Sequence, residues 1–132
     1  MDIHGLTKII IADDDEDILT IAKFCLEDLK GVDVKYCTSG EEAIQIALTS
    51  PPDMILLDVM MPKMDGIDTL KALRLIPKLS SIPVVFFTAK VQKNELNKFR
   101  EIGCYDVIAK PFDPLTLSHT ILGIWKKYQE SH

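Results

Sequence analysis

The sequence KIIIADDDED, residues 8–17, joins a short apolar run directly to five consecutive acidic residues. Continuous apolar runs of this kind are typical of strands that are covered on both faces of a parallel sheet. Carboxylates at the end of a buried strand lose hydration and repel one another, which raises the free energy of the folded chain unless a positive charge compensates them. The stretch therefore predicts a buried strand that ends beside a cation.

The rest of the chain alternates between strand-like and helix-like segments. Short apolar runs at residues 54–57, 82–87 and 105–109 resemble the run at 8–12, and each predicts a buried strand. Residues 32–37 alternate apolar and polar side chains, which favours an edge strand. Segments with helical periodicity lie between and after the strands, so we expect a parallel sheet with helices on both faces.

Residues typical of helix ends indicate where three of these helices begin or end. The first helix is expected to run to Gly31, a residue suited to a helix C-terminus. Ser39 and Glu42 have the spacing of a capping box at the start of the second. The last helix is expected to begin near Asp113 and Pro114, because proline is favoured in a first helical turn.

Composition indicates one ordinary globular domain. The chain has 132 residues, which we take as a single domain with a core at about residues 7–128 and no effector domain. The net charge of −5 argues against direct nucleic acid binding. No apolar stretch approaches the roughly 18 residues that a membrane span requires, and three scattered cysteines fit a reducing cytoplasm.

Polar residues follow four of the five predicted strands. Asp13 and Asp14 follow the first strand, Asp58 the third, Thr88 the fourth and Lys110 the fifth. In a parallel sheet all these strand ends open on one edge, where ligands bind. We therefore expect three carboxylates, a hydroxyl and an ammonium group to converge from four loops.

The acids at this edge predict a divalent cation. Asp14, Asp58, a backbone carbonyl and waters would suit Mg²⁺, which prefers octahedral oxygen ligands, and Mn²⁺ should substitute. The acids at 15–17 are interpreted as helix N-terminal residues instead. An EF-hand is excluded, because Ile18 occupies the position that requires glycine. The Lys110–Pro111 bond is a candidate cis peptide.

The motifs IIIADDD, LLDVMMPKMDG, VVFFTAK and AKPF, in this order, resemble the receiver domain of two-component response regulators. The resemblance covers about residues 7–128. It implies a flavodoxin-like fold with strand order 2-1-3-4-5. It also implies that the domain is no enzyme beyond its own phosphorylation and dephosphorylation.

The same resemblance assigns a role to each residue of the site. Asp58 would accept a phosphoryl group from a phosphohistidine of a sensor kinase or phosphotransfer protein. Asp13 and Asp14 would hold Mg²⁺, with the Met60 backbone carbonyl as a further ligand. Thr88 and Lys110 would contact the phosphoryl oxygens. These residues act by position and charge, which is what phosphoryl transfer requires.

Two features depart from the pattern of many receivers, and one further residue bears on the lifetime of the modification. Val107 stands where a tyrosine or phenylalanine is usual; Tyr105, two residues earlier, is expected on the same face of the strand. Lys90 is expected to influence the lifetime of the aspartyl phosphate. The last helix lacks the arginines of a charged dimer face, so that type of dimer is not expected.

We expect the domain to transmit its signal by contact with a downstream protein, on the face formed by the fourth helix, the fifth strand and the fifth helix. The alternative is a degenerate receiver that acts only as an interaction module. A phosphatase of the haloacid-dehalogenase type would need an aspartate at position 60, which is methionine. A flavodoxin that holds FMN would need a hydroxyl- and glycine-rich loop after the first strand, where this chain has acids.

Overall fold

Five parallel strands form one sheet in the order β2-β1-β3-β4-β5. A computed structural model of the chain describes residues 5–89 and 92–132. The strands are β1 (Lys8–Ala12), β2 (Asp33–Cys37), β3 (Met54–Asp58), β4 (Val84–Thr88) and β5 (Asp106–Ala109). The predicted flavodoxin-like topology is confirmed, and the alternating strand β2 lies at an edge.

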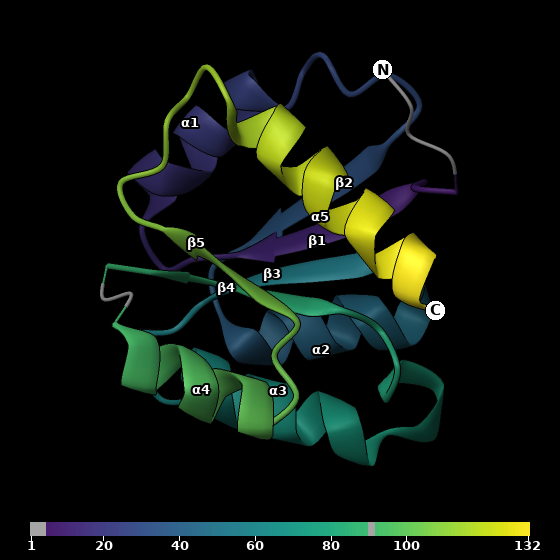
Figure 1. Cartoon of the computed structure of the whole chain (residues 1–132), viewed down its shortest axis with the longest axis vertical. Coiled ribbons are helices and arrows are strands. Elements are labelled where there is room, and N and C mark those ends of the chain that lie inside the picture. Colours follow the sequence, from purple (N-terminus) through teal and green to yellow (C-terminus); the bar gives the residue numbers. More distant parts are fainter. Residues whose placement is uncertain (1–4, 90–91) are drawn as a thin grey trace.

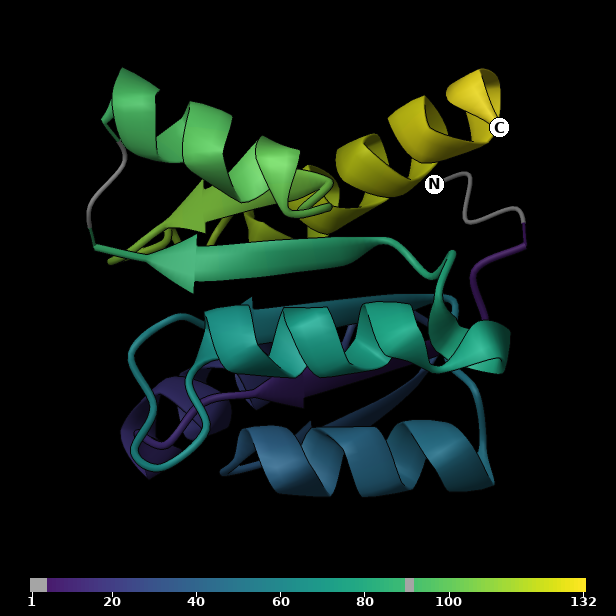
Figure 2. The same ribbon diagram turned by 90° about the horizontal axis from the view of Figure 1, so that it is seen from below.

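Helices cover both faces of the sheet, as Figures 1 and 2 show. They are α1 (Glu16–Cys25), α2 (Gly40–Thr49), α3 (Gly66–Leu75), η1 (Pro77–Leu79, a short 3₁₀ helix), α4 (Lys93–Glu101) and α5 (Leu117–Ser131). Helices α1 and α5 lie on one face, and α2, α3 and α4 lie on the other. In the part of the chain that is described, no helix has the length and apolar character needed to cross a membrane.

The core is divided by the sheet into two layers. Strand β3 is buried along its whole length, and its side chains alternate between the layers. Leu56 packs on the α1 and α5 side, whereas Leu57 packs on the side of α2 and α3. This two-sided burial explains why the strand reads as a continuous apolar run.

Two of the predicted helix boundaries are wrong. Helix α1 ends at Cys25, and the chain reaches Gly31 through turns that still place Leu29 in the core. Those turns prolong the apolar spacing without prolonging the helix. Helix α5 begins at Leu117, because the carboxylate of Asp113 accepts a hydrogen bond from the Leu115 amide and holds the preceding residues in a turn.

Side-chain caps start the helices that follow β2 and β3. Ser39 accepts a hydrogen bond from the Glu42 amide, but the Glu42 carboxylate bonds Thr38, so only half of the predicted capping box forms. A complete capping box occurs instead at α3, between Asp65 and Asp68. The caps fix where α2 and α3 leave the carboxyl edge of the sheet.

Candidate functional site

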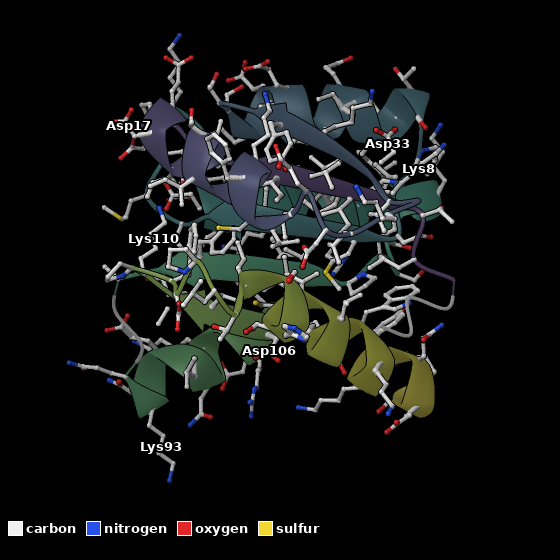
Figure 3. All side chains as sticks on the ribbon, turned by 90° about the horizontal axis from the view of Figure 1, so that it is seen from above. Lys8, Asp17, Asp33, Lys93, Asp106 and Lys110 are labelled. Carbon is white, nitrogen blue, oxygen red and sulfur yellow. The ribbon has the colours of Figure 1, made fainter. Side chains whose placement is uncertain are left out.

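The carboxyl ends of the strands bring the predicted residues together. Figure 3 shows Lys110 and Asp17 at one end of the molecule and Lys8 and Asp33 at the opposite end, where β1 and β2 begin. Asp58 and Thr88 are the last residues of β3 and β4, and Lys110 directly follows β5. The Lys110 amide donates to the Thr88 carbonyl over 2.9 Å, which ties these two strand ends together.

Asp58 is held in a buried position at the end of β3. It pairs in register with Phe87 of β4, and the next amide, that of Val59, donates to the Phe87 carbonyl. Gly66, at the start of α3, closes over this strand end: its amide donates to the Val59 carbonyl over 2.9 Å. A Cβ atom at position 66 would lie only 2.5 Å from the Asp58 carbonyl oxygen. Close packing therefore fixes the backbone that carries the Asp58 carboxylate.

Lys110 supplies the positive charge that the acids require. Its ammonium nitrogen lies 3.0 Å from Asp58 Oδ1 and 2.6 Å from Asp13 Oδ2. Burial alone would lower the pKa of Lys110, but its contacts with the two carboxylates raise the pKa above its usual value. Lys110 therefore remains charged. The Lys110–Pro111 bond is cis, as predicted.

The Asp58 carboxyl group is less acidic than an ordinary aspartate. Burial raises its pKa to about 6; the hydrogen bond from Lys110 acts in the opposite direction, and the negative charge of Asp13 adds to the increase. Two carboxylates so close together resist joint ionisation. Additional positive charge at this point would therefore favour the ionised form of Asp58.

The acidic cluster fits a divalent cation. Carboxylate oxygens of Asp13, Asp14 and Asp58 lie within 4.8 Å of one another. Asp13 is fully buried; its Oδ1 accepts from the Asp15 amide, and its Oδ2 lies 2.6 Å from the Lys110 ammonium nitrogen. Three carboxylates that face one another with only one ammonium group between them form a donor set that suits Mg²⁺, which prefers oxygen ligands.

The neighbouring acids belong to helix α1, as the sequence indicated. Asp15 is its N-cap and accepts a hydrogen bond from the Asp17 amide over 2.9 Å. Glu16 and Asp17 occupy the first turn, where the helix dipole favours negative charge. These acids therefore stabilise the helix that follows Asp13 and Asp14.

Thr88 and Met60 line a small cavity beside Asp58. The cavity has a volume of about 200 Å³ and also contacts Glu95 and Phe99 of α4. The Thr88 residue is buried, whereas the Met60 side chain is 81% exposed. Thr88 thus shares this cavity with residues of α4.

The prediction that Tyr105 lies on the same face of the sheet as Val107 is wrong. Val107 packs on the α2, α3 and α4 side of the sheet, whereas Tyr105 packs on the α1 and α5 side, with its ring 5.3 Å from that of Tyr128. Tyr105 precedes the first residue of β5, so strand alternation does not extend to it. It therefore cannot replace an aromatic residue at position 107. Lys90 lies outside the described residues.

Two supporting residues were not predicted from the sequence. Gly66 approaches the backbone of Asp58, and the Asp65-Gly66 pair could have been identified as an N-cap signal. Arg74 donates from its guanidinium to the carbonyls of Ile82 and Gly103, which joins α3 to the ends of two loops. No local pattern identifies that role, because the partners are distant in sequence.

Curated relatives include two bacterial transcriptional regulatory proteins. The alkaline phosphatase synthesis regulator PhoP of Bacillus subtilis is 38% identical over 120 residues, which cover 91% of this chain and 49% of that protein. The regulator CpxR of Escherichia coli is 36% identical over 132 residues, covering 96% of this chain and 55% of that protein. The chain thus spans about half the length of these relatives.

Solved structures and a family profile lead to the same assignment. The chemotaxis response regulator CheY4 of Vibrio cholerae superposes with a TM-score of 0.83 at 28% identity, covering 91% of this chain and 99% of that chain. A response regulator from Desulfuromonas acetoxidans has a TM-score of 0.79 at 28% identity, covering 91% and 97%. Residues 9–122 match the profile of the response regulator receiver domain. The chain therefore belongs to the receiver domain family of two-component response regulators.

Proposed function

We propose that this chain accepts a phosphoryl group on Asp58 from a phosphohistidine, with Mg²⁺ held by Asp13, Asp14, Asp58 and the Met60 carbonyl. The observation that carries the proposal is the position of the Lys110 ammonium group between the carboxylates of Asp58 and Asp13. A single cation shared by two buried acids leaves negative charge in excess. A divalent ion would balance that excess and prepare the site for a dianionic phosphoryl group.

The reaction is a displacement at phosphorus. An oxygen of the Asp58 carboxylate attacks, a P–O bond forms, and the P–N bond breaks with its electron pair leaving on the imidazole nitrogen. Lys110 then pairs with a phosphoryl oxygen, and the Thr88 hydroxyl donates to another. Bound Mg²⁺ would neutralise charge on the phosphoryl oxygens. The chain's own contribution is position, because the end of β3 fixes the attacking carboxylate.

The donor would be a sensor histidine kinase or a histidine phosphotransfer protein. The relatives named above are transcriptional regulators, but the net charge of −5 gives this chain itself no basis for contacting DNA. We place its action in the cytoplasm. A downstream protein would bind the face formed by α4, β5 and α5; Lys110 directly follows β5, and Thr88 ends β4, the strand paired with β5.

Acetyl phosphate, a small phosphodonor, tests the proposal without requiring the kinase. The chain is incubated with acetyl phosphate and Mg²⁺, and its intact mass is recorded beside that of Asp58→Asn. We expect the mass of one phosphoryl group on the parent chain, none on the variant, and none when EDTA removes the metal. A Thr116→Ala variant, altered at an exposed residue outside the site, serves as the control and should be phosphorylated like the parent. Equal phosphorylation of the parent and Asp58→Asn would contradict the assignment of Asp58.

A further inference from the structure

Strand β2 leaves one side of its backbone unpaired at the edge of the sheet. It is bonded to β1 on its inner side, where the Asp33 amide donates to the Thr7 carbonyl over 2.8 Å. Because successive residues of a strand direct their backbone groups to alternate sides, the amides and carbonyls of Val34 and Tyr36 face outward. No other strand in the described part of the chain pairs with β2 on that side.

The neighbouring helix α2 does not close over this edge. A groove of about 330 Å³ lies between the strand and the end of α2, and its lining residues are Lys35, Gln45, Ile46, Thr49 and Ser50. The side chains of Asp33 and Lys35 are 54% and 59% exposed. A further strand can therefore approach β2 from the open side of the sheet.

The charges on this edge are self-complementary. Asp33 and Lys35 lie two residues apart on one face of the strand, with Lys35 Nζ 3.8 Å from Asp33 Oδ1. If β2 of a second copy runs antiparallel, with Val34 opposite Val34, then Asp33 of each copy lies opposite Lys35 of the other. Opposite charges in facing positions stabilise a strand pair, and like charges destabilise it. Moving the centre of the pairing to Asp33 or to Lys35 would place that residue opposite its own like charge.

The same register also matches the backbone groups and the apolar side chains. Val34 would exchange two backbone hydrogen bonds with Val34 of the second copy, as a hydrogen-bonded antiparallel pair does. Tyr36 would lie opposite Val32, and an aromatic residue facing a β-branched one favours strand pairing. Val32, Val34 and Tyr36 all pack on the α1 and α5 side of the sheet. One register therefore satisfies the backbone, the charges and the apolar side chains together.

We propose that two copies of this chain associate through antiparallel pairing of β2 with β2, which joins their two five-stranded sheets into one. A lysine on an edge strand ordinarily discourages pairing with other chains. Here Asp33 selects a second copy as the partner, because an uncharged strand would leave both charges without an opposite charge. The contact is isologous, as twofold symmetry requires. Because the paired strands run in opposite directions, the two acidic sites lie at opposite ends of the joined sheet, and the inference does not depend on phosphorylation of Asp58.

Sedimentation equilibrium over a range of protein concentrations tests the inference. The samples are the parent chain, the single variants Asp33→Lys and Lys35→Asp, the double variant that carries both substitutions, and an equimolar mixture of the two single variants. The control is Lys98→Glu, which changes the net charge as Lys35→Asp does. Lys98 is exposed on α4, the helix that precedes the strand at the opposite edge of the sheet. Circular dichroism establishes that each variant is folded.

We expect the parent chain and the control to form a reversible dimer with the same dissociation constant. Each single variant brings two pairs of like charges into the contact, so its dissociation constant should rise at least about tenfold. The double variant and the mixture should associate like the parent, because opposite charges face each other again. A parent chain that remains monomeric at about 1 mM would overturn the inference. A double variant that associates as weakly as the single variants would overturn it as well.

Amide hydrogen exchange identifies the strand that forms the contact. The amides of Val34 and Tyr36 should exchange more slowly as the concentration of the parent chain rises, because pairing with the second copy would protect them. In Lys35→Asp the exchange of these amides should not depend on concentration. Protection that appears on α4 or β5, with no change at Val34 and Tyr36, would assign the dimer to another face and refute the pairing of β2.

Discussion

Replacement of Gly66 by alanine should destabilise the domain and slow its phosphorylation. The new Cβ would lie 2.5 Å from the Asp58 carbonyl oxygen and 2.9 Å from the Val59 Cα. Ordinary contacts between carbon atoms are about 3.5–4.0 Å. Both opposing atoms belong to the backbone, so no side-chain rotation relieves the overlap, and the end of β3 must move away from α3.

The energetic effect combines two opposing contributions. Overpacking of this kind costs about 1–3 kcal/mol. Alanine improves helix propensity over glycine by at most about 1 kcal/mol. Because both close contacts are to backbone atoms, we take the upper part of that range, about 2–3 kcal/mol, so the net loss is about 1–2 kcal/mol, or roughly 3–10 °C in Tm for a domain of this size. Because the same movement displaces Asp58, and an error of about 1 Å can reduce a rate about 100-fold, we expect phosphorylation to slow by roughly 10- to 100-fold.

Gly123→Ala is the matched control, because a Cβ at position 123 in α5 has no neighbouring atom within 4 Å. This variant should gain about 0.5–1 kcal/mol from helix propensity. Urea unfolding followed by circular dichroism gives both free energies of unfolding, and intact mass against time gives both phosphorylation rates. If Gly66→Ala were as stable as Gly123→Ala and as rapidly phosphorylated, the role assigned to the close contact at Asp58 would be refuted.

Metal binding, pH and a loop anchor give three further expected outcomes. Adding Mg²⁺ at about 100 times its dissociation constant should stabilise the folded chain by about 2.7 kcal/mol, which is measured as an increase in Tm. Asp13→Asn should remove most of this increase. An equal increase in Tm in the variant would exclude Asp13 as a ligand. In EDTA, without a metal, the folded-state pKa of Asp58 is about 6, above its unfolded-state pKa of about 3.8. The folded state therefore favours protonated Asp58. The stability that this contributes is fully present below about pH 3.8 and is lost as pH rises through about 6. Asp58→Asn should therefore have the higher Tm at pH 8, with the difference closing toward pH 4, and a difference that grows on acidification would contradict the sign. Arg74→Met removes the guanidinium group that donates to the carbonyls of Ile82 and Gly103, and should lower the free energy of unfolding in urea by about 2–4 kcal/mol. Arg74→Lys should retain part of that stability. Equal stability of Arg74→Met and the parent would show that these two hydrogen bonds contribute nothing.

The strand order and the meeting of the site residues could be predicted because they follow from topology. Once residues 8–12 and 54–57 are identified as buried parallel strands, Asp13 and Asp58 must lie at one edge of the sheet. The helix boundaries were harder to predict. Leu29 follows the apolar spacing of a helix although it lies in a turn, and a side-chain bond from Asp113 delays the start of α5.

The supporting contacts could not be predicted because they join residues far apart in the sequence. The contact of Gly66 with Asp58 depends on how α3 packs across the end of β3. The position of Tyr105 could not be predicted because β5 begins at Asp106, one residue after the start of the strand predicted at residues 105–109. Tyr105 therefore lies outside the regular alternation of side chains. Local patterns therefore identify which residues carry the chemistry, whereas the three-dimensional packing determines how they are held.

The central claim, that Asp58 is the phosphoacceptor, is tested most directly by locating the modified residue. The chain is treated with acetyl phosphate and Mg²⁺ and then with sodium borohydride, which reduces an aspartyl phosphate to homoserine, and its peptides are sequenced by tandem mass spectrometry. We predict homoserine at position 58, at no other aspartate, and not in a sample prepared with EDTA. Homoserine at Asp13 or Asp14, or none at position 58 in protein that has gained the mass of a phosphoryl group, would contradict the account.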